Sequence, residues 1–193
     1  MKFETPLIRG ILLKRYKRFM ADIELEDKSI ITAHCPNSGS MLSINVPGST
    51  VWISKAKNPN RKLKYTLELI CIKNAIIGVN TNHPNNLVSE AIVSDIIPEL
   101  SGYTSLRREV KYGENSRIDI LLQSKEKPDC YVEVKNVTMR RDNLRDSYAE
   151  FPDSITSRGK KHLCELSKMR RDGYRGVMLF LVQRNDIKTF GIA

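Results

Sequence analysis

The first eighty residues alternate short apolar segments with turn-forming segments, and this pattern restricts the fold more than any other feature of the chain. The intervening segments PNSGS, NVPGS and KNPNRK are rich in Pro, Gly and Asn, which favour turns. Apolar segments of about five to ten residues with a two-residue period are typical of β-strands. Five fit that description: LIRGILLKRY, FMADIEL, SIITAHC, TVWISKA and KYTLELICI. They predict a small five-stranded β-barrel over residues 1–80.

Near residue 80 the pattern changes to a mixture of helix and strand. The segment NHPNNLVSEAIVSDIIPEL opens with Asn and Pro and then spaces its apolar residues as an amphipathic helix does. We expect the buried stripe of this helix to be formed by Leu87, Ala91, Val93, Ile96 and Ile97. Strand candidates LRREVKYG, SRIDILLQ and CYVEVKNV follow. The order predicts a mixed α/β domain over residues 81–193.

A second helix is expected over residues 157–173, followed by the apolar strand GVMLFLVQ. Leu163, Leu166 and Met169 are spaced three residues apart and predict its buried stripe, while basic residues occupy the remaining positions. Gly173 is a helix-ending residue. We therefore expect a basic helix packed on the sheet, either as a solvated face or as a surface that holds a phosphate backbone.

Basic residues outnumber acidic ones, and they are unevenly distributed. The chain has 32 Lys and Arg against 22 Asp and Glu, a formal net charge of +10. No acidic residue occurs from Lys28 to Leu67, and a second basic cluster spans residues 158–175. This distribution favours a polyanionic partner such as DNA, although a generally basic surface is the alternative. A basic barrel of five strands is typical of an OB-like, oligonucleotide-binding fold.

The cysteine spacing and the N-terminal segment indicate in which cellular compartment the protein lies. The four cysteines form no CxxC pair, so neither a zinc site nor a disulfide framework is indicated. Glu4 and Arg9 interrupt the short apolar start, which argues against a signal peptide, and no stretch approaches the length of a membrane span. We expect a cytoplasmic protein, with association with the nucleoid as an option. The sequence indicates no membrane and no protein partner.

Three charged residues lie in the middle of strands that otherwise belong in a core. Asp119 interrupts SRIDILL, and Glu133 and Lys135 share one face of CYVEVKN. An unpaired buried carboxylate costs several kcal/mol, so Asp119 needs a partner. If the two strands pair, Asp119 and Glu133 meet in a pocket where Mg²⁺ or Mn²⁺ would relieve their repulsion, and Lys135 would activate a water or stabilise a phosphate. The alternative is a salt-bridged cluster without chemistry.

The pattern Asp119, Glu133, Lys135 resembles the D…ExK signature of the PD-(D/E)xK nuclease superfamily. A broader resemblance, to the sugar fermentation stimulation protein family, spans nearly the whole chain. It is carried by HCPNSGSM (34–41), NPNRKLKYTLE (58–68), SRIDILL (116–122), YVEVKNVT (131–138) and FPDSITSRGKKHLCEL (151–166).

The resemblance implies an N-terminal OB-like β-barrel followed by an α/β PD-(D/E)xK nuclease-like domain. It implies DNA binding with little sequence specificity and a role in regulating sugar metabolism, maltose in particular; a Mg²⁺-dependent DNA endonuclease is the alternative. Asp119 and Glu133 match the metal-binding acids and Lys135 the catalytic lysine. Glu90 lies where the superfamily often adds an acid, or it is an exposed helix carboxylate.

Members of the family run on past LFLVQRND into a further helix and strand, so the resemblance also implies that this chain lacks its usual C-terminal elements. An exposed sheet edge or poor solubility would follow. A third hypothesis is therefore a degraded remnant that folds poorly.

Further residues are candidates for DNA contact. Asn37 lies in a turn whose amides could hold a phosphate, or whose own side chains simply hold it together. Arg158 and His162 are one helical turn apart and can face the same groove, or His162 packs between helix and sheet. The expected nucleic-acid-binding set is His34, Asn37, Arg61, Lys62, Arg117, Arg158, Lys160 and His162.

Overall fold

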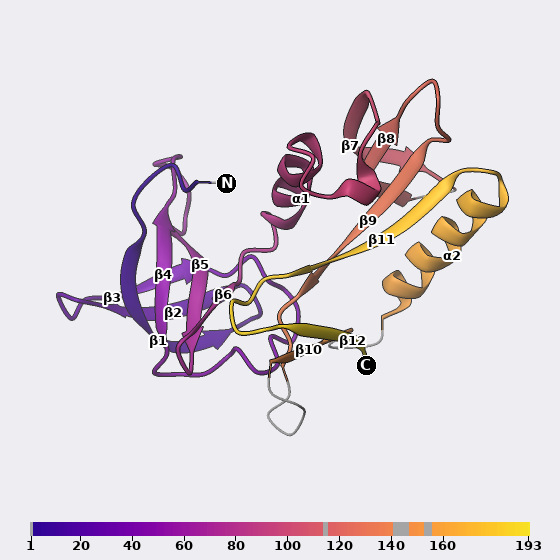
Figure 1. Ribbon diagram of the computed structural model, residues 1–193. Coiled ribbons are helices and arrows are strands. Elements are labelled where there is room, and N and C mark those ends of the chain that lie inside the picture. Colours follow the sequence, from indigo (N-terminus) through magenta and orange to yellow (C-terminus); the bar gives the residue numbers. More distant parts are fainter. Residues whose placement is uncertain (1, 114–115, 141–146, 153–155) are drawn as a thin grey trace. The chain divides into compact units, whose positions relative to one another are not determined.

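The computed structural model describes residues 2–113, 116–140, 147–152 and 156–193 (Figure 1). It divides into two compact units that interleave along the chain. The barrel unit comprises Lys2–Asn82, Val137–Ser154 and Val182–Ala193. The sheet unit comprises His83–Asn136 and Ile155–Leu181. Each unit is built on its own sheet and is described separately.

The barrel unit opens with strands that close on themselves. The strands are β1 (Ile8–Tyr16), β2 (Met20–Leu25), β3 (Ile30–His34), β4 (Thr50–Lys55), β5 (Tyr65–Ile72) and β6 (Ala75–Gly78). They are ordered β3-β2-β1-β4-β5-β6. A parallel pairing of β3 with β5, through Ala33 with Tyr65 and His34 with Thr66, closes the first five into a barrel. The predicted five-stranded barrel is confirmed.

The two-residue period of the sequence arises from the barrel core. Ala21 and Ile23 on β2, and Val51 and Ile53 on β4, are fully buried, while the residues between them are only partly buried. Burial of alternate side chains on one face is what a half-buried strand requires. Strand β6 was not predicted, because four residues show little periodicity of their own. It pairs with β5 across a short turn.

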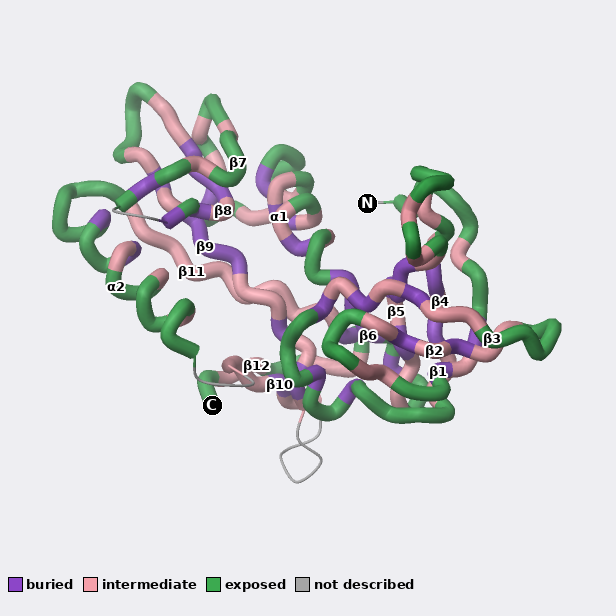
Figure 2. Tube along the Cα trace, turned by 180° about the vertical axis from the view of Figure 1, so that it is seen from behind, coloured by how far each residue is buried: buried purple, intermediate pink, exposed green. Residues whose placement is uncertain are grey.

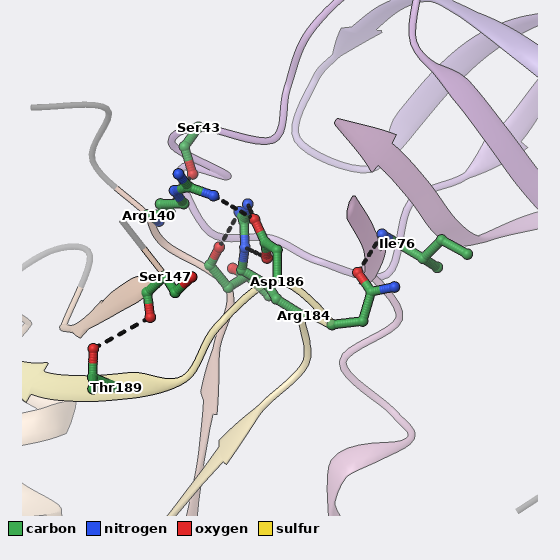
Figure 3. Close-up of polar contacts among 9 residues, drawn as sticks. Ser43, Ile76, Arg140, Ser147, Arg184, Asp186 and Thr189 are labelled. Atoms are coloured by element: carbon green, nitrogen blue, oxygen red, sulfur yellow. Dashed lines mark hydrogen bonds and ion pairs between the residues drawn. The ribbon is translucent and has the colours of Figure 1, made fainter. Parts of the chain in front are cut away.

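Late segments of the chain complete the barrel unit. Strands β10 (Tyr148–Phe151) and β12 (Thr189–Ile192) pair in parallel. Figure 3 shows polar contacts around Arg184, whose guanidinium donates to the Asp186 carboxylate through Nε and Nη2 at 2.9 Å each. Arg140 donates to the same carboxylate at 2.7 Å. The neighbouring Asn185 accepts the backbone N–H of Ile76 at the start of the β6 hairpin strand. The Asn185 contact attaches this segment, residues 184–186, to β6, and the Arg140 contact attaches it to the segment that follows β9.

The sheet unit has one sheet between helices. Its strands are β7 (Ser105–Tyr112), β8 (Ser116–Gln123), β9 (Cys130–Val137) and β11 (Arg175–Val182), ordered β11-β9-β8-β7. Helix α1 (Pro84–Val93) and the short 3-10 helix η1 (Pro98–Leu100) precede the sheet, and α2 (Ser157–Arg171) precedes β11. Figures 1 and 2 show α1 and α2 on opposite sides of β9 and β11. The mixed α/β fold predicted from the sequence is confirmed.

Each helix packs on a separate apolar cluster. Val88 and Ile92 of α1 belong to a cluster with Ile120, Leu122 and Val132. Leu166 and Met169 of α2 belong to another with Tyr112, Ile118 and Leu121. Figure 2 shows these buried stretches of β8 and β9 in purple. In the described residues no helix is long and apolar enough to cross a membrane.

The buried face of the first helix differs from the prediction. α1 ends at Val93, and its buried residues are Pro84, Val88 and Ile92 rather than the predicted stripe. Val93 and Ile96 are 73% and 70% exposed. Several apolar residues fit helical spacing in this segment, so spacing alone does not select the face that docks. In α2, Leu166 and Met169 are buried as predicted, whereas Leu163 is 51% exposed.

Candidate functional site

The centre of the site lies where strands β8 and β9 separate. The antiparallel ladder runs through Leu122 with Cys130, Leu121 with Tyr131 and Ile120 with Val132. The next pair in this register is Asp119 with Glu133. There the Asp119 side chain replaces the ladder, because its Oδ2 accepts the backbone N–H of Val134 at 2.7 Å. The charge of Glu133 acts on Asp119, so the two predicted acids lie near each other at the end of the ladder.

Asn85 of α1 holds the other oxygen of Asp119. Its side-chain amide donates to Asp119 Oδ1 at 3.0 Å and to Glu109 Oε1 at 3.1 Å. In the β7–β8 register Glu109 is opposite Asp119, since the flanking pairs are Arg108 with Ile120 and Val110 with Ile118. Glu109 has a φ of 53°, which is rare for a residue with a side chain. Carboxylates thus lie in a row across β7, β8 and β9.

The surroundings of Asp119 include burial and two neighbouring carboxylates, which disfavour its charged form. Burial raises the pKa of the Asp119 carboxyl, and the nearby charges of Glu133 and Glu109 add to that effect. The hydrogen bonds from Val134 and Asn85 oppose it, since they stabilise the carboxylate. A cation at this position would relieve the repulsion.

Glu133 is the most buried charged group of the site, with its side chain 3% exposed. Its Oε1 accepts from Lys135 Nζ at 2.6 Å and also contacts His162 Nδ1 of α2. Among the described residues, its Oε2 is buried and has no hydrogen-bond partner. Lys135 therefore neutralises Glu133, as the salt-bridged interpretation expects, yet one carboxylate oxygen remains available to a ligand.

The available residues fit a divalent cation only in part. Asp119 and Glu133 supply carboxylate oxygens of the kind that Mg²⁺ and Mn²⁺ prefer, and Glu133 Oε2 is a buried acceptor that a cation would satisfy. Over the described ranges, however, no three His, Cys, Asp or Glu side chains are arranged to hold a metal ion. Any such ion would keep several waters, as Mg²⁺ commonly does.

Glu90 lies on α1 as well, on a different face of the helix from Asn85. It is exposed on α1, five residues after Asn85, which turns it well away from the helix face that carries Asn85. The contact from α1 to Asp119 is made by Asn85, a residue that the sequence analysis missed. The predicted metal role of Glu90 stays a prediction.

Two further polar residues near the acids were also missed. Tyr112, at the end of β7, is 8% exposed, and its hydroxyl has no hydrogen-bond partner in the described part of the chain. Burial raises its pKa, and the charges of Glu133, Glu165 and Asp119 raise it further. Glu165 is on α2, three residues after His162, and this helical spacing is a signal that could have identified it.

In the barrel unit, the predicted His34 lies beside an exposed aromatic ring. Phe19, in the turn between β1 and β2, is 48% exposed, and its ring is stacked with His34 at 6.4 Å between centroids and 15° between planes. Arg61 donates to the Thr66 hydroxyl at 2.8 Å, and Thr66 is the register partner of His34. Burial lowers the pKa of His34 and the charge of Arg61 lowers it further, which favours a neutral ring near pH 7.

The Asn37 turn is held by the Asn37 side chain and by Arg15 of β1. Asn37 is buried and its Oδ1 accepts the Gly39 N–H at 2.9 Å. Arg15 donates to the carbonyl oxygens of both residues at 2.9 Å each. This geometry matches the structural interpretation of the segment, and DNA contact by Asn37 stays a prediction.

The remaining candidates are distributed over both units. Lys62 is exposed in the loop between β4 and β5 of the barrel unit. The sheet unit carries Arg117, Arg158 and Lys160, all exposed, and His162, whose side chain is 13% exposed and contacts Glu133. His162 therefore lies at the acidic site, and its predicted contact with DNA stays a prediction. In the fifth sequence block, residues 153–155 lie outside the described residues.

Comparison with known proteins identifies the family. The model of the SfsA N-terminal OB domain matches residues 13–79, and that of the sugar fermentation stimulation protein RE domain matches residues 82–193. The chain belongs to the sugar fermentation stimulation protein family. The resemblance predicted from five sequence blocks is thereby confirmed.

Sugar fermentation stimulation protein homologues are similar over nearly the whole chain. The homologue from Rhodospirillum rubrum is 55% identical over 96% of this chain and 79% of its own length. That from Rhodospirillum centenum is 55% identical over 100% of this chain and 82% of its own length. A solved structure, SfsA of Pyrococcus furiosus in complex with Ca²⁺, is 27% identical with a TM-score of 0.86, and the match covers 100% of this chain and 79% of that one.

Proposed function

We propose that this sugar fermentation stimulation protein homologue binds DNA with little sequence specificity through the barrel surface around Phe19, His34 and Arg61. The observation that carries the proposal is the stack of an exposed Phe19 on His34 beside a guanidinium. Aromatic faces stack on any base, and basic side chains bind phosphates without reading sequence. The formal charge of +10 supports the same partner.

The proposal includes a cytoplasmic location, associated with the nucleoid, and a role in regulating sugar metabolism, maltose in particular. The names of the relatives, which refer to stimulation of sugar fermentation, support the link to sugar metabolism.

Salt dependence of binding tests the DNA proposal. Fluorescence anisotropy with two duplexes of unrelated sequence should give similar affinities, and log affinity should fall steeply against log salt concentration. Arg61→Ala should weaken binding to both duplexes. Lys28→Ala is the matched control, because Lys28 is an exposed cation paired with Glu24 in the turn before β3. Affinity that is indifferent to salt, or confined to one duplex, would contradict the proposal.

A second candidate function is a Mg²⁺- or Mn²⁺-dependent DNA endonuclease. It is favoured by one specific observation, the meeting of Asp119, Glu133 and Lys135 at the end of the β8–β9 ladder. The Ca²⁺ complex of SfsA from Pyrococcus furiosus supports a divalent-cation site. Asp119 and Glu133 would hold the ion, which when bound would supply Lewis-acid chemistry and neutralise phosphate charge. Lys135 would orient a water or stabilise charge on the phosphate.

Plasmid and single-stranded DNA cleavage in Mg²⁺, Mn²⁺ and EDTA tests this candidate. Cleavage should require the cation and should be abolished by Glu133→Ala. Glu126→Gln is the matched control, because Glu126 is an exposed acid of the same unit. Cleavage that survives Glu133→Ala would contradict the nuclease proposal.

A cooperative thermal transition of the purified chain would count against a poorly folding remnant.

A further inference from the structure

Two side chains of like charge are register partners in the sheet unit. Lys111 of β7 pairs with Arg117 of β8, and both side chains are exposed. Directly opposite residues of an antiparallel pair share one face of the sheet, where like charges destabilise the pairing and opposite charges stabilise it. No ion pair joins either side chain to an acid in the described part of the chain. The sheet therefore carries a cross-strand repulsion on its surface.

Protection of the sheet edge explains only part of this charge. β7 is the last strand in the order β11-β9-β8-β7, and exposed charges on an edge strand prevent it from pairing with another chain. That role suffices for Lys111 and for Arg107 and Arg108, which are exposed on the same strand. Arg117 is on β8, which lies between β7 and β9, so protection of the β7 edge does not explain its charge.

The pair lies beside the row of carboxylates on the same two strands. Asp119 follows Arg117 by two residues on β8, and Glu109 precedes Lys111 by two residues on β7. Residues two apart in a strand are on one face, and the intervening Ile118 is fully buried on the other. Two residues of strand span about 7 Å. Two cations thus lie next to the candidate cleavage site.

We propose that Lys111 and Arg117 bind phosphates of one DNA strand, so that its backbone passes beside Asp119. Phosphates take contacts from Lys and Arg without any reading of sequence, and a guanidinium can hold a phosphate through two hydrogen bonds. A bound phosphate would also relieve the repulsion between the two side chains. The inference rests on the proposed DNA binding, to which it adds a second surface, in the sheet unit. It requires neither cleavage nor a bound cation.

A lysine footprint on the full chain tests the location of this surface. Acetylation measured by mass spectrometry, with and without a saturating duplex, should show that Lys111 loses most of its reactivity when DNA is bound. Lys125 is the matched control, because it is an exposed lysine in the turn that follows the other end of β8. An unprotected Lys111 in a chain that binds DNA would overturn the inference and leave the barrel surface intact. A chain that binds no DNA would overturn both.

The salt dependence of binding tests the phosphate contacts. The double variant Lys111→Gln, Arg117→Gln should reduce the slope of log affinity against log salt by about two, one for each contact. The double variant Lys28→Gln, Lys125→Gln removes the same charge from exposed lysines and should keep the wild-type slope. Arg117→Lys should also keep it, because a cation remains. Equal slope changes in the two double variants would reduce the effect to net charge and overturn the inference.

Thermal unfolding without DNA separates a binding role from a structural one. Lys111→Gln, Arg117→Gln should leave the transition unchanged or raise it, because a cross-strand repulsion is removed. A lowered transition together with weaker binding would assign the pair a structural role and overturn the inference.

Discussion

The carboxylate of Asp119 accepts the backbone N–H of Val134 at 2.7 Å, across the point where the ladder between β8 and β9 ends. A side chain thus completes a pairing that the two backbones no longer make. Asp119 therefore has a structural role whether or not it binds a cation, because it holds the strand that carries Glu133. Loss of activity in an Asp119 variant has to be separated from loss of this contact.

We expect Asp119→Ala to lower the free energy of unfolding by about 1–3 kcal/mol, because it leaves the Val134 N–H and the Asn85 amide without their acceptor. Asp119→Asn should cost less, since its amide oxygen can still accept from Val134. Urea denaturation monitored by circular dichroism measures both. Equal stabilities for wild type and Asp119→Ala would show that the contact contributes nothing.

The pair formed by Glu133 and Lys135 should be costly to break from one side only. Their side chains are 3% and 16% exposed, and Nζ lies 2.6 Å from Oε1. Lys135→Met should lower the free energy of unfolding by less than the roughly 3–5 kcal/mol of a buried charge left unpaired, because Glu133 keeps its contact with His162. The double variant Glu133→Gln, Lys135→Met should recover a large part of that loss. Denaturant titration of the three variants gives the coupling energy, and additive losses would contradict a buried pair.

Asp186 should make the stability of the barrel unit depend on acid pH. The hydrogen bonds from Arg184 hold the pKa of Asp186 at about 2, below its usual 3.8. A carboxyl whose pKa is lower in the folded state stabilises the fold above the unfolded pKa, and this stability is lost as the pH falls through the folded value.

We therefore expect a stability loss between about pH 4 and pH 2 that Asp186→Asn reduces, together with lower stability of the variant at pH 7. Thermal unfolding over this pH series measures it, with Glu126→Gln as a control for an exposed acid. A wild-type pH profile retained by Asp186→Asn would show that other groups titrate.

Substitutions on the barrel surface should separate charge from stacking. Arg61→Ala should weaken duplex binding and reduce the slope of log affinity against log salt by about one, the contribution of one phosphate contact. Phe19→Ala should leave that slope unchanged and weaken binding to single-stranded DNA by about 1–3 kcal/mol, the range for one stacked base. Because Arg61 also donates to Thr66, thermal unfolding of Arg61→Ala has to be measured alongside. Identical salt slopes for wild type and Arg61→Ala would remove Arg61 from the DNA surface.

Strands with a clear apolar period and turn-forming residues at both ends were predicted correctly from the sequence. The strand predictions around SRIDILLQ and CYVEVKNV coincide with β8 and β9, because apolar periodicity and flanking turns define both ends. Strands β6, β10 and β12 escaped prediction, since each has four residues. β10 and β12 pair with each other across about forty residues of chain, and such pairing leaves little local trace.

The same distinction applies to the candidate site. Asp119, Glu133 and Lys135 stood out because charges in apolar strands are costly without a partner. Asn85 and Tyr112 are ordinary in sequence, and only packing brings an amide to Asp119 and leaves a hydroxyl buried beside carboxylates.

The sequence by itself determined the strands of the barrel, the mixed α/β class of the second half and the family. It also determined the acids of β8 and β9. Each of these depends on local patterns of charged and apolar residues. Tertiary structure decided that residues 182–193 belong with the barrel unit, that His162 contacts Glu133, and that Asn85 donates to Asp119. The physical reason is that these relationships depend on which helix face docks and which distant strands pair. Both are set by burial of the whole core and are not encoded in any short segment.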